Sequence, residues 1–173
     1  ALLEQMLSAA NNLSDFLLTQ SPTINIPWVK GELTKEQFLS MRAFDIWAHD
    51  QDVRVAIGAP QNLMSNPGKD AAQRMFGTLP FIWGKKMGVP SGESLQLVFT
   101  GPDIDGTLFI ATGPEDKAAF VSEPTGEITH IEISWADFVN GYCGRVDPDV
   151  TATRMTGSGP RAREFINALA STP

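Results

Sequence analysis

The sequence predicts an α+β protein in which a helical N-terminal part precedes a small, mostly antiparallel sheet with helices packed on one face. Apolar residues recur at helical spacing in two long stretches near the start of the chain. Short β-rich runs separated by Gly and Pro turns follow in the second half. A chain of 173 residues that is 42% apolar can bury a real core. We divide it into a partial helical-bundle domain (1–60), a connecting helix and hinge (61–90) and an α+β domain (91–173).

Two helices are predicted at the start of the chain. The first covers residues 2–19 and leads into an irregular connection over 22–31. The second covers about 35–57 and starts at a capping box formed by Thr34 and Gln37. Two helices alone leave an apolar face of each uncovered, because helical bundles usually contain more helices.

The rest of the chain is predicted as a linker, a helix and then the sheet domain. Residues 61–70, rich in Asn, Pro and Gly, form the best linker. A helix follows from about Ala71 until Pro80 breaks or kinks it, and Ser134 caps another helix that reaches Tyr142. The predicted strands are 95–99, 107–111, 118–122, 128–133 and a fifth over 149–156, and a last helix runs from Pro160 to about Ala170.

Charge and composition restrict the partners of the protein. The formal net charge of −7 argues against nucleic acid or an anionic membrane as a partner. No stretch approaches the roughly 20 apolar residues of a membrane span. The single cysteine, Cys143, excludes an internal disulfide and favours a cytoplasmic location. Because the first residue is Ala1, we expect the chain to be a processed or trimmed piece of something longer.

The second predicted helix carries ionisable residues in an unexpected place. Asp45, His49 and Asp52 fall near the middle of its apolar arc, where burial of charge is costly unless it is paired or bound to metal. Asp45 and His49, four residues apart, could supply two ligands to zinc. Spacing alone favours the other interpretation, a buried network in which Arg42 pairs with Asp45 and Asp45 hydrogen-bonds His49. No third ligand is evident, since His130 is expected to be exposed or paired with its neighbour Glu132.

Three other features each allow a structural and a functional interpretation. Cys143 is better explained as a packed small residue than as a nucleophile, because no histidine accompanies it. Arg145 follows the end of a predicted helix, where it could cap the helix or reach a ligand carboxylate. The aromatic and basic segment 76–86 could form the wall of a ligand cleft or a hydrophobic hinge between two cores. Nucleotide-binding and serine-hydrolase motifs are absent from the sequence.

The most specific motif of the chain lies on the second predicted helix and consists of Arg42, Asp45, Trp47, His49, Gln51, Asp52, Val53 and Arg54. It resembles the motif of the mycothiol-dependent maleylpyruvate isomerase family, which is related to the DinB-like metal-binding bundles. Segments 81–86, 89–90 and 95–102 resemble the beginning of this family's C-terminal domain, and the likeness covers essentially the whole chain. The resemblance implies a DinB-like helical bundle followed by a small α+β domain similar to sterol-carrier folds.

The resemblance also implies a metal site and a substrate-binding residue. In the family, a histidine on an early helix joins an acid-x-x-x-His pair to hold a divalent metal, usually zinc. Asp45 and His49 match that pair, whereas the early histidine has no counterpart here. We therefore expect the family's first two helices to be missing before Ala1. Gly144-Arg145 resembles a Gly-Arg pair that grips an anionic substrate, which makes Arg145 the candidate catalytic residue.

The implied function is that of a metal- and thiol-dependent transferase or isomerase acting on a small electrophilic substrate. Zinc would hold a low-molecular-weight thiol such as mycothiol as its reactive thiolate, while Arg145 holds a substrate carboxylate. The alternative is a non-catalytic small-ligand-binding or interaction module in which Asp45 and His49 form a purely structural pair. Because apolar helix faces are left uncovered, we also expect a homodimer.

Overall fold

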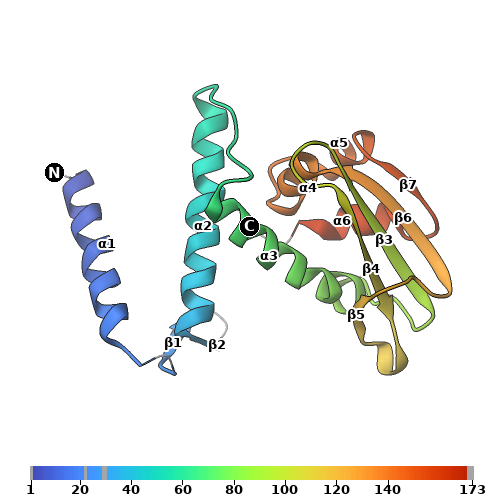
Figure 1. Ribbon diagram of the computed structural model, residues 1–173, viewed down its shortest axis with the longest axis horizontal. Helices are drawn as coiled ribbons and strands as arrows, with labels where there is room; N and C mark the ends of the chain where they lie inside the picture. The colour runs from blue at the N-terminus through green and yellow to red at the C-terminus, as the bar shows by residue number, and fades with distance from the viewer. Residues whose placement is uncertain (1, 22, 29–30, 171–173) are drawn as a thin grey trace.

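The computed structural model describes residues 2–21, 23–28 and 31–170 and is an α+β protein (Figure 1). Within these residues it contains six α-helices, a two-stranded antiparallel sheet and a five-stranded mixed sheet. The helices are α1 (Leu2–Thr19), α2 (Lys35–Ala56), α3 (Asn66–Pro80), the π-helix η1 (Phe81–Lys86), the 3-10 turn η2 (Pro114–Asp116), α4 (Trp135–Tyr142), α5 (Pro148–Thr153) and α6 (Ala162–Leu169). The strands are β1 (Asn25–Trp28), β2 (Gly31–Thr34), β3 (Glu93–Thr100), β4 (Gly106–Thr112), β5 (Ala118–Val121), β6 (Glu127–Ser134) and β7 (Thr156–Ser158).

The first two helices occupy the predicted ranges. The Thr34 hydroxyl accepts from the Gln37 amide, and the Gln37 side chain accepts from the Thr34 amide, which confirms the predicted capping box. The irregular connection predicted over 22–31 is wrong where β1 and β2 pair as a hairpin. Pro27 is tolerated there because both strands are edge strands. Residues 22 and 29–30 of that stretch lie outside the described residues.

α3 packs against α2 through Trp47 and Gly68. An added Cβ at Gly68 would overlap a neighbouring backbone carbonyl and lie 3.2 Å from Trp47 Nε1, so only glycine fits this position. The linker predicted over 61–70 is wrong in its second half, because the Ser65 side chain caps α3 and starts the helix early. The disruption predicted at Pro80 is confirmed, since the α-helix gives way there to η1.

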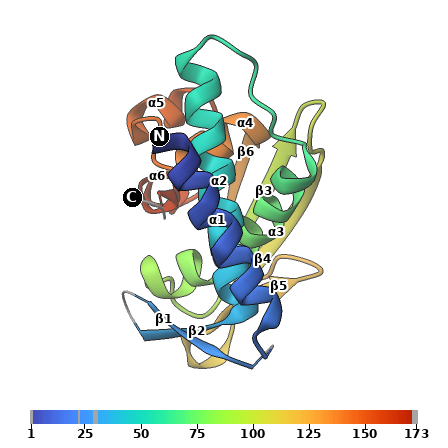
Figure 2. The same cartoon turned by 90° about the vertical axis from the view of Figure 1, so that its left-hand side faces the viewer.

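The larger sheet has the strand order β5-β4-β3-β6-β7. β3 pairs in parallel with β6, and the other three pairs are antiparallel. The first four predicted strands and the helix after Ser134 are confirmed. The fifth strand, predicted over 149–156, is wrong: the Asp147 side chain caps α5, and Pro148 fits the first helical position. The helices of this part pack on one face of the sheet, as predicted (Figure 1, Figure 2).

One continuous core joins α2 and α3 to the larger sheet. The Phe138 ring meets Phe99 edge-on at 5.1 Å and stacks on Trp135 at 5.6 Å between centroids. Trp83 is fully buried in the same core, as expected for a hydrophobic hinge, whereas Gly77 and Thr78 of the same predicted segment line a hollow between α2 and α3. This core extends across both boundaries of the predicted three-part division. The division itself stays a prediction.

A bidentate ion pair fastens α6 to the start of β3. Arg161 donates from Nε to Glu93 Oε2 at 2.9 Å and from Nη2 to Glu93 Oε1 at 2.9 Å. Arg161 Nη1 also donates to Glu164 at 3.0 Å. The Arg161 guanidinium holds the pKa of the Glu93 carboxyl below its ordinary value of 4.5, against the opposing effect of burial.

We expect Glu93→Gln to destabilise the protein at neutral pH and to cost progressively less at acid pH. Because the Glu93 pKa is lower in the folded than in the unfolded chain, its stabilising effect is complete well above pH 4.5 and is lost as the pH falls through the folded-state pKa. Urea unfolding should show a loss of about 1 kcal/mol near neutral pH. Glu164→Gln, which removes a more exposed carboxylate from the same arginine, is the control and should cost less. A Glu93→Gln penalty independent of pH would contradict this assignment.

Candidate functional site

Asp45, His49 and Asp52 form a charged row along one side of α2, because they are spaced at i, i+4 and i+7. The expectation that they are buried is wrong: their side chains are 45%, 67% and 38% exposed, respectively. The row lies beside the buried face of the helix, so the desolvation cost of a buried charge does not arise. The residues of that buried face are Phe38, Phe44, Trp47, Ala48 and Gln51.

The His49 ring lies between the two carboxylates of the charged row. Its Nδ1 is 3.1 Å from Asp52 Oδ2, and its Nε2 is 3.5 Å from Asp45 Oδ1. The first distance is that of a hydrogen bond, whereas the second is too long for a strong one. Arg42 donates to the other oxygen of Asp45 at 2.6 Å. The Arg42–Asp45 pair expected in the structural interpretation is therefore present, at the surface.

Arg145 connects the charged row to the loop after α4, 93 residues further along the chain. Its Nε donates to Asp52 Oδ1 at 2.8 Å, and its Nη2 donates to Asp52 Oδ2 at 2.9 Å. Its Nη1 donates to the Cys143 carbonyl at 2.6 Å. The guanidinium therefore holds Asp52 in a bidentate pair, and Asp52 in turn contacts the Nδ1 edge of His49.

The charges of Arg145 and Asp52 determine which atoms of this site donate hydrogen bonds and which accept them. The hydrogen bond from Arg145 lowers the pKa of Asp52 below its ordinary value of 3.8, and the His49 contact lowers it further, against the effect of burial. Asp52 raises the pKa of Arg145 in turn. Asp52 is thus a carboxylate near neutral pH and can only accept hydrogen bonds. A hydrogen bond from His49 Nδ1 to this carboxylate requires the ring proton on Nδ1, and a neutral ring that makes it keeps its lone pair on Nε2.

A cavity of about 400 Å³ lies between α2 and α4 beside the charged row. Asp52 and Arg145 line it together with apolar side chains and the side-chain amide of Asn140. Its volume is in the range of small-ligand pockets. Cys143 also lines the cavity but is buried, in agreement with its prediction as a packed residue.

Sequence reasoning missed the role of Gln51. Its buried side chain donates to the Trp47 carbonyl at 3.2 Å and accepts from the Asn62 amide at 2.8 Å, which ties the end of α2 to the following loop. The spacing of Gln51 from Trp47 indicates that both share a helix face. Nothing in the sequence identifies Asn62 as the distant partner.

Asp45 and His49 fit two adjacent ligands of a divalent metal. Zinc ligand distances of about 2.0–2.2 Å place two tetrahedral ligands roughly 3.3–3.6 Å apart, and Asp45 Oδ1 lies 3.5 Å from His49 Nε2. A carboxylate on the other ring nitrogen, here Asp52, is the usual partner of a metal-binding histidine. Within residues 2–21, 23–28 and 31–170, no group of three metal-binding side chains forms. His130 lies on β6 opposite Gln96 of β3 and is not part of the charged row.

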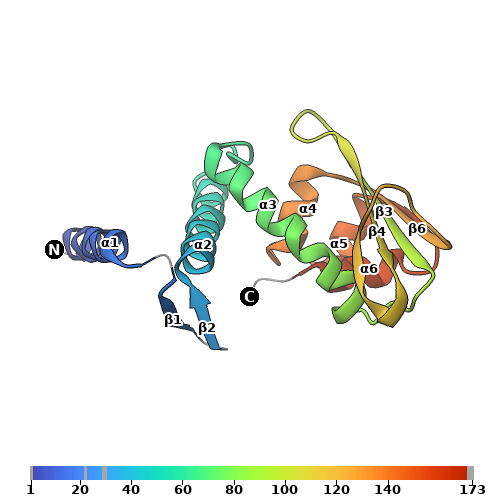
Figure 3. The same cartoon turned by 60° about the horizontal axis from the view of Figure 1, so that its bottom comes forward.

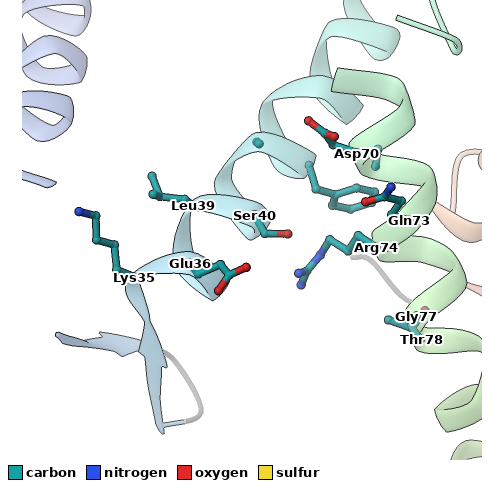
Figure 4. A pocket seen from close by; sticks show the side chains of 12 residues that line it. Lys35, Glu36, Leu39, Ser40, Asp70, Gln73, Arg74, Gly77 and Thr78 are labelled. Atoms are coloured by element: carbon teal, nitrogen blue, oxygen red, sulfur yellow. The ribbon is translucent and has the colours of Figure 1, made fainter. Parts of the chain in front are cut away.

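A second and larger hollow, of about 900 Å³, lies between α2 and α3 (Figure 4). Arg74 reaches from α3 toward α2, and its guanidinium lies 5.9 Å from the centre of the Phe44 ring. Neither the charged row nor Arg145 lines this hollow. It is therefore separate from the candidate metal ligands.

Comparison of the chain with protein-family models and with the curated proteins finds no match. Among the helices of the described residues, none is long and apolar enough to cross a membrane. The candidate site therefore rests on its own geometry.

We expect a double-mutant cycle on Asp52 and Arg145 to give a coupling free energy of about 1–2 kcal/mol, because the pair is bidentate and joins distant segments. The variants Asp52→Asn, Arg145→Met and their combination would be compared by urea unfolding. The matched control is the Asp50–Arg54 pair, which lies within α2 at 2.8 Å and should couple by only about 0.3–0.5 kcal/mol. Equal coupling in the two cycles would show that the Arg145 contact adds nothing beyond an ordinary surface pair.

Proposed function

We propose that this chain belongs to a metal- and thiol-dependent transferase or isomerase of the mycothiol-dependent maleylpyruvate isomerase type, which acts on a small electrophilic substrate. In this proposal the N-terminal helices form part of a DinB-like bundle, and the larger sheet belongs to a sterol-carrier-like domain. The observation that carries the proposal is the setting of His49. Its Nδ1 faces the Asp52 carboxylate, and its Nε2 lies one ligand-to-ligand distance from Asp45 Oδ1.

Four residues have distinct roles in the proposed site. Asp45 and His49 hold zinc or another divalent metal, with a third ligand from outside the described residues. Asp52 accepts from His49 Nδ1 and so orients the ring, as outer carboxylates do in known metal sites. Arg145 orients Asp52 and keeps it ionised, which makes Arg145 a positioning residue in this arrangement.

The proposed chemistry is thiol addition to an electrophilic carbon. A bound zinc ion supplies the thiolate form of a low-molecular-weight thiol such as mycothiol at neutral pH. The 400 Å³ cavity beside the charged row offers an apolar place for the substrate. Three nitrogens of Arg145 donate to Asp52 and the Cys143 carbonyl, so the structure shows this guanidinium in its positioning role. The catalytic role implied by the resemblance, in which Arg145 holds a substrate carboxylate, is a separate part of the proposal.

The second candidate function is a non-catalytic module that binds a small ligand in the same cavity. The observation that favours it is the Arg42–Asp45 ion pair at 2.6 Å, which neutralises Asp45 without a metal. In that case Asp45 and His49 only stabilise α2 as i,i+3 and i,i+4 pairs. Metal binding separates the two candidates.

We expect the intact protein, with the third ligand in place, to bind roughly one zinc ion, and His49→Ala to abolish this binding while the fold is retained. Equilibrium dialysis followed by elemental analysis measures the zinc, and circular dichroism checks the fold. Asp52→Asn keeps both ligands and should weaken binding by about tenfold to a hundredfold. His130→Ala is the matched control and should leave binding unchanged. Zinc binding that is absent in the unsubstituted intact protein, or unaffected by His49→Ala, would contradict the proposal.

The thiol component has a separate readout. Cobalt in place of zinc should give visible absorption bands, and an added low-molecular-weight thiol should add a thiolate-to-cobalt charge-transfer band. If added thiol left the cobalt spectrum unchanged, the proposed metal site would stand and the proposed thiol-dependent chemistry would be rejected.

A further inference from the structure

α1 carries a broad apolar face that the described chain leaves uncovered. Apolar residues recur on this face at alternating intervals of three and four residues, which is the pattern of a stripe by which one helix packs on another. We call this stripe the seam of α1. The members of this seam are Leu3, Met6, Ala10, Leu13 and Leu17. Only Leu17, near the end of the helix, is buried. The large apolar side chains of α1 that are 43–76% exposed are Leu2, Leu3, Met6, Leu7, Leu13, Phe16 and Leu18.

α2 has a second seam, on an exposed face whose first two members also line the hollow between α2 and α3. We call it the outer seam, and its members, at the same three- and four-residue spacing, are Leu39, Ala43, Ile46, Asp50, Val53 and Ile57. All six are exposed to solvent. Asp50 is the polar member, and its carboxylate is paired with Arg54 at 2.8 Å. The outer seam therefore has the pattern of a helix-packing surface and not that of a solvated face.

The two seams do not cover each other within one chain. α1 stands apart from α2 and does not pack along it (Figure 1, Figure 3). The start of the outer seam, at Leu39, projects toward the side on which α1 stands (Figure 4). The C-terminal end of α1 is held near the start of α2, where Lys35 Nζ donates to the Gln20 carbonyl at 3.1 Å. The rest of α1 extends from this contact without packing against α2.

We infer that a second copy of this chain covers both seams, in a two-fold dimer whose α1 and α2 helices form an antiparallel four-helix bundle. The width of the apolar face of α1 favours this occupant. Leu2, Leu7 and Phe16 extend the face beyond the seam, so α1 needs two helical neighbours, whereas one chain offers a single outer seam. Two copies supply four helices, and a two-fold axis covers every seam with the same contact.

The area available is sufficient for a stable dimer. Eleven exposed large apolar side chains lie on α1 and on the outer seam of each copy. A buried side chain of this kind removes roughly 60–120 Å² of apolar surface from water. Even with partial burial, two copies together cover on the order of 1,000 Å² or more, which reaches the size of a specific interface. The inference uses no residue of the charged row. It differs from the proposed DinB-like bundle in what covers the seams, because in that bundle further helices of the same chain would cover them and would leave a monomer.

We expect the 173-residue chain to sediment as a dimer and to become a monomer when either seam is interrupted by charge. Leu13→Asp interrupts the seam of α1, and Ile46→Asp interrupts the outer seam of α2. Val150→Asp, at an exposed apolar residue of α5, is the matched control and should remain a dimer. Leu13→Ala and Ile46→Ala should each weaken dimerisation by at least about tenfold. Circular dichroism checks the fold, and the alanine variants decide the outcome where an aspartate variant fails to fold.

Three results would overturn the inference. These are a monodisperse monomer for the unsubstituted chain, a dimer that both seam variants leave unchanged, and assembly into open chains of copies instead of a closed pair. Zinc binding is measured separately by dialysis. A monomer that still binds zinc through His49 would therefore reject the dimer and retain the proposed function.

Discussion

The packing of α2 against the body of the protein is the constraint on which the other features depend. Trp47 contacts Gly68 of α3, and Gln51 holds the loop that leads to it, so the rotation of α2 about its axis is fixed. At 100° per residue, this rotation places the charged row on one side of the buried face and the outer seam on the other. A single buried face therefore determines which residues meet Arg145 and which are left for another helix.

The charged row acquires its order from a residue far away in the sequence. Arg145 holds Asp52, and Asp52 orients His49, so a helix and a distant loop together set the direction of one imidazole. Asp52 stays ionised because Arg145 lowers its pKa, and an ionised carboxylate selects the His49 tautomer with a bare Nε2. This chain of contacts supports a metal-binding role for His49 better than its spacing from Asp45 does.

Local sequence signals predicted the helix starts at Thr34 and Ser134 but not those at Ser65 and Asp147, although a side chain caps the helix at all four. The capping box at Thr34 and the cap at Ser134 act over three residues, so they are visible without the fold. The fifth predicted strand is wrong because Asp147 and Pro148 start a helix there, despite the β-branched residues that follow them. The parallel pairing of β3 with β6 could not be predicted, since it depends on contacts between strands separated by a hairpin and a loop.

The candidate site was predicted in its residues but not in its environment. Asp45 and His49 were selected because they share a helix face, and the structure does place them side by side. Their burial was predicted wrongly, because helical periodicity does not tell which of two apolar stripes meets the core. Asp52 and Arg145 gain their roles only through a contact across 93 residues, which a single sequence does not reveal.

The tautomer of His49 tests the central claim most directly. Long-range ¹H–¹⁵N correlation spectra of the histidine rings, recorded above the ordinary histidine pKa, distinguish a protonated from a bare nitrogen at each ring position. The account predicts that His49 carries its proton on Nδ1 and that Asp52→Asn or Arg145→Met removes this preference. A His49 ring protonated on Nε2 in the unsubstituted protein would contradict the account, because the nitrogen that faces Asp45 would then be unable to bind a metal.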